Sequence, residues 1–308
     1  MSIADQITRL SNAKAAIKQS IENKGVEVSD SALLDEYPAL IDSIEVGSGG
    51  EGGADPYYET LWNCITNNNT DYNYLFHNYN GKTLDVSNFD TSNVTDMQSI
   101  FYNCNQLTSL DVSNWDTSNV TNMAYMFNSC TNLTSLDVSN FNTSNVTDMR
   151  YMFYICSSLT QLDVSNFDTS NVTTMQGMFY NCHSLTSIDV SNFDTSNVTS
   201  IYMMFVNCWE ITSLDCSNWD ISKCTSTSSI GTAFNNCKKL VDFKAPKNIS
   251  ANMSVANSTA LSHDSLMSII NNLATVTSSK TLTLGATNLA KLTDEEKTIA
   301  TNKGWKIA

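Results

Sequence analysis

The chain has 308 residues, of which 41% are hydrophobic, 15% are charged and 9% are aromatic. Serine, threonine and asparagine take the place of charged residues, whose usual share is about 25%. The 16 basic and 31 acidic residues give a formal net charge of −15, which repels nucleic acid and anionic membranes. Because no segment reaches the roughly 20 apolar residues of a membrane span, we expect neither nucleic-acid binding nor membrane insertion.

The N-terminal segment predicts an oligomerisation helix over residues 3–24. Its apolar seam follows heptad spacing, interrupted by Lys14, and consists of Ile3, Ile7, Leu10, Ile17 and Ile21. Isoleucine at both core positions favours three or more strands in a coiled coil, so we expect a homotrimer. A small helical hairpin over residues 1–46, without a role in assembly, is the alternative interpretation. We expect a flexible glycine-rich linker over residues 47–56.

A repeat of 26 residues dominates the rest of the chain. The units begin at Leu84, Leu110, Leu136, Leu162, Ile188 and Leu214. The unit at Leu110 reads LDVSNWDTSNVTNMAYMFNSCTNLTS. The unit at Leu214 is irregular and carries three extra residues, since the equivalent cysteines Cys208 and Cys237 are 29 rather than 26 residues apart. Repetition at a fixed period of this length indicates a stack of similar coils that bury one another's apolar sides.

Within each unit the pattern changes from a strand-like to a helix-like period. Leu110, Val112 and Trp115 alternate with polar residues, which is typical of a strand buried on one face. After an Asp-Thr-Ser-Asn turn, apolar side chains recur at the spacing of a short helix or helical turn. These side chains are Met123, Met126, Phe127, Cys130 and Leu133. We therefore expect an α/β repeat solenoid of the leucine-rich-repeat type over residues 57–250, with a parallel sheet on one face.

The unit LDVSNFDTSNVTxMxxMFxxCxxLTS closely resembles the 26-residue repeat of BspA-like leucine-rich-repeat surface proteins. The resemblance spans about residues 60–250 and implies extracellular binding or adhesion, without catalytic residues. Residues 1–46 resemble N-terminal modules of virion appendage proteins from tailed bacteriophages, in the run ITRLSNAKAAIKQSIENKGVEVSDSALLDEYPALIDSI and the glycines after it. This second resemblance implies that the segment binds other virion proteins.

Residues 251–308 predict a small α/β cap over the open end of the last coil. The run SHDS at residues 262–265 indicates the start of an apolar helix. A strand over 280–284 follows, then a helix over 292–302 and a short strand at Trp305.

Six cysteines share one repeat position on the apolar side: Cys104, Cys130, Cys156, Cys182, Cys208 and Cys237. Equivalent residues of stacked coils are about 4.8 Å apart and parallel, whereas a disulfide needs Cβ atoms about 3.8 Å apart. We therefore expect a buried row of reduced thiols, which pack as small hydrophobic side chains.

Two polar positions also recur in every unit. The aspartate at the second position predicts a row of carboxylates, in which candidate calcium ligands are Asp111, Asp137, Asp163 and Asp189. A solvated row without metal is the other interpretation, and we expect no other metal and no cofactor. The asparagine at the fifth position predicts a buried row of amides bonded to the backbone, at Asn88, Asn114, Asn140, Asn166, Asn192 and Asn218.

Aromatic residues that differ between the units predict a ligand-binding surface. They are Tyr102, Tyr125, Tyr151, Tyr154, Tyr180, Tyr202 and Trp209. Because the adjacent Met, Phe and Cys residues occupy the core, we expect these rings, including Tyr151 and Tyr154, to be exposed. Exposed aromatic rings at regular spacing suit contact with sugars or with a protein. Isolated surface tyrosines without a ligand are the alternative.

The sequence therefore favours a non-enzymatic phage virion appendage that displays the repeat surface to a host glycan or protein. The sequence contains no Gly-x-Ser-x-Gly motif, phosphate-binding glycine loop or zinc-protease motif. The first residues lack the features of a secretion signal, so we expect synthesis in the host cytoplasm and release by lysis. A bacterial cell-surface adhesin and a purely structural virion decoration protein are the alternatives.

Overall fold

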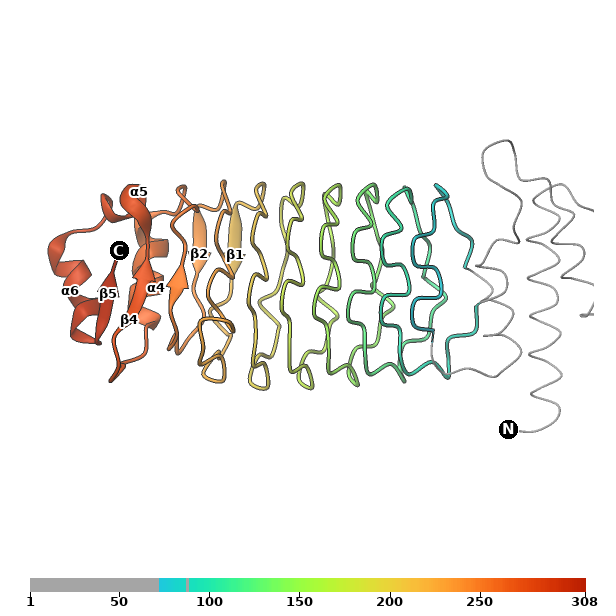
Figure 1. The fold of residues 1–308 in the computed structure, drawn as a ribbon, viewed down its shortest axis with the longest axis horizontal. Helices are drawn as coiled ribbons and strands as arrows, with labels where there is room; N and C mark the ends of the chain where they lie inside the picture. The colour runs from blue at the N-terminus through green and yellow to red at the C-terminus, as the bar shows by residue number, and fades with distance from the viewer. Residues whose placement is uncertain (1–71, 87–88) are drawn as a thin grey trace, which may run out of the picture. The chain divides into compact units, whose positions relative to one another are not determined.

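A computed structural model of the protein describes residues 72–86 and 89–308. The expected oligomerisation helix, the glycine-rich linker and the start of the repeat region lie outside the described residues, as does Asn88. From Tyr72 to Ala308 the chain forms one unit, in which successive coils stack along a single direction and lead into C-terminal helices (Figure 1).

Parallel backbone hydrogen bonds join each coil to the next. Met97 N donates to the carbonyl oxygen of Asn122 at 3.0 Å, and Met123 N donates to that of Asp148 at 3.0 Å. Isolated parallel bridges continue this pairing through Asp96, Asn122, Asp148, Thr174 and Ser200. Beyond this point Ile201 N bonds the carbonyl oxygen of Ser229 at 2.7 Å, so three extra residues lengthen one coil without interrupting the stack.

A series of turns forms the side of each coil on which a short helix or helical turn was expected. Among the described residues before Ser262, no helix is assigned. Hydrogen bonds instead join residues three apart, such as Met126 N to the Met123 carbonyl oxygen at 3.3 Å. Tyr125 and Ser129 have φ angles of 61° and 62°, which an α-helix excludes but a turn accepts. We call this side the turn face, formed by residues 97–106, 123–132, 149–158, 175–184 and 201–209.

The expected strand on the other side of the coil is assigned at two places in the described repeat region. These strands, β1 (Ser213–Asp215) and β2 (Asp242–Lys244), pair in parallel. In an earlier coil Leu110 and Val112 are buried and Asp111 is exposed. The alternation of buried and exposed side chains predicted for a strand is therefore present there, although the segment does not pair as a strand. The parallel bridges that continue from coil to coil lie beside the turn face instead.

Phenylalanine rings stack through the centre of the coils. The rings of Phe101 and Phe127 are 5.5 Å apart between centroids, and those of Phe127 and Phe153 are 5.6 Å apart. The stacked series comprises Phe76, Phe101, Phe127, Phe153, Phe179 and Phe205. Because these rings are buried and nearly parallel, each coil packs the same side chain against its equivalent in the next coil.

The predicted burial of the cysteine row is confirmed. The six cysteines of the row are buried and free, and each thiol donates a hydrogen bond to a phenylalanine carbonyl oxygen of the preceding coil. For Cys156 this acceptor is the carbonyl oxygen of Phe127, at 3.1 Å. Burial raises the pKa of Cys104, Cys182 and Cys237 to about 12.

The C-terminal helix, strand, helix and short strand predicted from the sequence are confirmed. They are α4 (His263–Asn272), β4 (Lys280–Thr283), α6 (Asp294–Asn302) and β5 (Trp305–Ile307). Two further elements, β3 (Met253–Ser254) and α5 (Gly285–Leu289), were not expected. Strands β3, β4 and β5 form a parallel sheet in that order. None of the helices in the described part of the chain is long and apolar enough to cross a membrane.

The cysteine row predicts slow reaction of the native thiols. With a pKa of about 12, only about one thiol in ten thousand is ionised at pH 8, and the thiolate is the reactive form. Because Cys64 lies outside the described residues, the measurement uses the Cys64→Ser variant. Its thiols should react with a chromogenic disulfide reagent only after denaturation, and a reductant should leave its Tm unchanged. Rapid labelling of several thiols in the native protein would contradict the buried row.

Candidate ligand-binding face

The turn face holds all seven aromatic residues that the sequence singled out. Tyr102 is exposed, at 37% of its accessible surface, whereas the other six are only partly exposed. The prediction that Tyr151 and Tyr154 are exposed therefore needs correction, because both rings are partly buried. Contacts between the tyrosines themselves, and between Tyr151 and residues of the next coil, account for this burial.

Four tyrosines from three consecutive coils form one cluster. The rings of Tyr125 and Tyr151 stack at 4.9 Å, and those of Tyr154 and Tyr180 stack at 4.7 Å. Tyr151 joins the two pairs, because its ring meets Tyr154 edge to face at 5.3 Å. We call these four residues the tyrosine cluster. Since stacking covers part of each ring face, edges and hydroxyl groups make up much of what remains accessible.

A glycine sets the position of Tyr151. Gly177 occupies the equivalent position in the next coil, with a φ of 59°, and a Cβ atom there would overlap the Tyr151 ring. The side chain of Gln176 donates a hydrogen bond to the Tyr151 hydroxyl. Neither residue was predicted from the sequence, although Gly177 was a visible signal: it is the only glycine between Lys82 and Ile230.

Trp209 belongs to a second aromatic group on the turn face. Its ring stacks on His183 with 3.8 Å between centroids, and Lys238 Nζ lies 4.2 Å from the centre of the Trp209 ring. Tyr202 lies against Gly231 of the following coil, much as Tyr151 lies against Gly177. At both places a glycine in the next coil leaves room for the aromatic ring.

Arg150 lies beside the tyrosine cluster and is paired with a carboxylate. Its Nε donates to Asp148 Oδ2 at 2.6 Å, and the guanidinium forms a salt bridge with the same carboxylate. Burial raises the pKa of Tyr125, Tyr151 and Tyr154, so their hydroxyls stay protonated at neutral pH. The cluster therefore offers neutral hydrogen-bonding groups.

The aspartate row lies on another side of the coils and bonds to its own serines. Ser113 N donates to Asp111 Oδ1 at 2.9 Å, and equivalent bonds occur at Asp137, Asp163 and Asp189. Bonds from the serine hydroxyl and backbone hold the pKa of these carboxyls below their ordinary value. A shallow open depression there is lined by Thr83, Leu84, Ser109, Leu110, Asp111, Ser135, Leu136 and Asp137.

The residues that the structure describes contain no group of three or more His, Cys, Asp or Glu side chains suited to hold a metal ion. Calcium binding by the aspartate row thus stays a prediction. At the end of the row Asp215 pairs with Lys244 of the next coil at 2.8 Å.

The asparagine row bonds to the backbone as predicted but is exposed rather than buried. Asn140 Nδ2 donates to the carbonyl oxygens of Val112 and Trp115 at 3.0 and 2.9 Å. Asn166 and Asn192 make equivalent bonds to the coils before them. The asparagine amides thus bond backbone carbonyl oxygens of the preceding coil, and their side chains remain exposed to solvent.

Stacked coils with one aromatic side define the protein as a tandem-repeat protein. The chain belongs to the family described as "Mycoplasma protein of unknown function, DUF285", which matches residues 70–162 and 160–265. This is the family of BspA-like repeats, so the resemblance seen in the repeat is confirmed at the level of the family. No curated protein matches the chain.

The fit between Gly177 and Tyr151 predicts a coupled effect of mutation. Gly177→Ala should lower the free energy of unfolding by about 1–3 kcal/mol, because alanine at positive φ is strained and its methyl group displaces the ring. In a Tyr151→Ala background the same change should cost less, since the ring is gone. Denaturant unfolding of the four proteins measures this coupling. Equal losses in the two backgrounds would show that Gly177 does not position Tyr151.

Proposed function

We propose that the protein is a non-enzymatic appendage of a tailed-phage virion that binds a host surface through the turn face. The observation that carries the proposal is the tyrosine cluster, which occupies the side where consecutive coils differ in sequence. Elsewhere the coils repeat nearly the same residues, which offer repetition but little discrimination.

The chemistry of the turn face supports a role in binding. Tyrosine, asparagine, serine and glycine are the residues that antibodies favour in their binding loops. Tyrosine supplies large amphipathic contact area at small entropic cost, and the stacking of Tyr151 and Tyr154 on their neighbours fixes the rings before a ligand arrives. Gln176 bonds the Tyr151 hydroxyl without carrying charge, and the charge of Arg150 beside the cluster is balanced by Asp148.

The assignment to a virion rests on the resemblance of residues 1–46 to phage appendage modules. In this proposal the segment trimerises the chain and attaches it to other virion proteins, and the coils form a solenoid of the leucine-rich-repeat type. A trimer presents three turn faces at once, which raises avidity where each single contact is weak.

Membership of a family named from Mycoplasma favours a second candidate, a bacterial cell-surface adhesin. Both candidates use the turn face for binding and differ in the particle that carries it. Immunogold labelling of a lysate from the infected host separates them. The proposal predicts gold on virions, whereas gold confined to the cell envelope would support the adhesin. A virion-bound protein that does not bind host cells would point to a structural decoration.

The apolar seam predicts the oligomeric state. Ile7→Asp with Ile21→Asp places charges in the seam, so the trimer expected for the full-length protein should dissociate to monomers. The matched control, Asn12→Asp with Gln19→Asp, adds the same charges off the seam and should leave the trimer intact. Light scattering of the three proteins measures the mass. A monomeric unmodified protein, or equal dissociation of both variants, would contradict the trimer.

A further inference from the structure

Charge is distributed unevenly around the coils. Residues 84–222 contain one basic residue, Arg150, and the acidic residues Asp85, Asp90, Asp96, Asp111, Asp116, Asp137, Asp148, Asp163, Asp168, Asp189, Asp194, Glu210, Asp215 and Asp220. None of these carboxylates falls within the five segments of the turn face, although Asp96, Asp148 and Glu210 border them. The turn face therefore carries no carboxylate, and Arg150, its one Lys or Arg residue, is paired with Asp148, so it is an aromatic surface of little net charge on an acidic stack.

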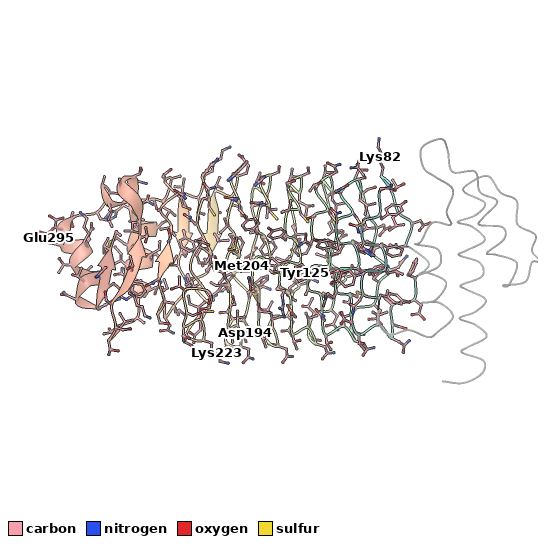
Figure 2. All side chains as sticks on the ribbon, in the orientation of Figure 1. Lys82, Tyr125, Asp194, Met204, Lys223 and Glu295 are labelled. Carbon is pink, nitrogen blue, oxygen red and sulfur yellow. The ribbon has the colours of Figure 1, made fainter. Side chains whose placement is uncertain are left out.

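The carboxylates lie in the sequence segments between and next to those of the turn face. In the view of Figure 2, Asp194 lies along one long edge of the stack and Lys82 along the opposite edge, with Tyr125 between them. At the border of the turn face Asp148 is neutralised by Arg150. A ligand that approaches the tyrosine cluster thus meets little net charge until it reaches the flanks.

Hydrogen-bonding groups are dense on the turn face. Asn103 Nδ2 donates to Asn78 Oδ1 at 2.6 Å, and Asn207 Nδ2 donates to Asn181 Oδ1 at 2.6 Å. Ser129 and Ile155 occupy the equivalent position in two coils of the tyrosine cluster, so these amide pairs lie toward its two ends. Because the coils stack in constant register, these groups extend along the stack, which suits an extended chain as ligand.

We infer that the turn face binds a neutral polysaccharide, whose hydroxyl groups bond the amides and tyrosine hydroxyls and whose C–H surfaces contact the tyrosine rings. This inference rests on the proposed function and names its ligand class. An anionic glycan is repelled by the acidic flanks, and a basic protein is drawn to those flanks rather than to the turn face. A neutral sugar chain has no such conflict.

A binding assay on the full-length protein tests the ligand class. The probes are arrayed neutral microbial glycans together with dextran, mannan and galactan, and the charged contrasts are anionic alginate and cationic chitosan oligomers. Binding to a neutral probe that persists when the NaCl concentration is raised is expected, because no ion pair is involved. Binding only to charged probes, or to no neutral probe, would overturn the inference.

Variants then locate the contact. Tyr102→Ala removes the most exposed of the seven rings and should weaken binding about three- to tenfold. Tyr154→Phe keeps the stacked ring and removes one hydroxyl, so it should weaken binding without changing the Tm. The matched control is Asp137→Asn with Asp163→Asn, on the acidic side, and should bind like the unmodified protein. Loss of binding in this control alone would move the site to the aspartate row.

Attachment to host cells separates failure of this inference from failure of the proposed function. Periodate oxidation of the cell surface should abolish attachment, whereas protease treatment should not. Attachment that resists periodate and is lost after protease would leave the proposed function standing and refute the glycan. Failure to attach to untreated cells would refute the proposed function itself.

Discussion

The structure depends on the parallel hydrogen bonds that join each coil to the next in constant register. Met97, Met123 and Met149 each donate from the backbone to a carbonyl oxygen 25 residues further along the chain. This register places every side chain beside its equivalent in the neighbouring coil. A side chain that packs well against a copy of itself can therefore occupy the same position in every unit. A side chain that repels its own copy must be exposed to solvent or replaced in some of the units.

Three side-chain types show this constraint. Phenylalanine stacks on phenylalanine in the core, and each thiol of the cysteine row donates a hydrogen bond to a carbonyl oxygen of the preceding coil. Aspartate beside aspartate is tolerated at exposed positions such as Asp111 and Asp137, where serines bond the carboxylates. The turn face carries no carboxylate, and its exposed residues differ between coils. Specificity for a ligand can therefore arise on this part of the surface.

The repeat predicted much of the fold, because core positions such as Phe127 and Cys130 recur with the period of the coil. The sequence left a short helix and a helical turn open, since apolar residues three apart fit both. The positive φ at residues such as Tyr125, which excludes the helix, was not predicted. The aromatic positions were predicted, but not the partial burial of Tyr151, which depends on a ring in one coil and a glycine in the next. Such pairings between coils become visible only when the register is known.

A deletion series measures whether the register governs the structure. Deleting residues 188–213 removes one complete unit and joins Ser187 directly to Leu214, which begins the next unit. Deleting residues 188–200 removes half a unit and places unlike side chains in adjacent coils. If each coil contacts only its neighbours in fixed register, the first protein should unfold cooperatively at a modestly lower Tm, whereas the second should lose cooperative unfolding. Equal stability of the two deletion proteins would contradict the account.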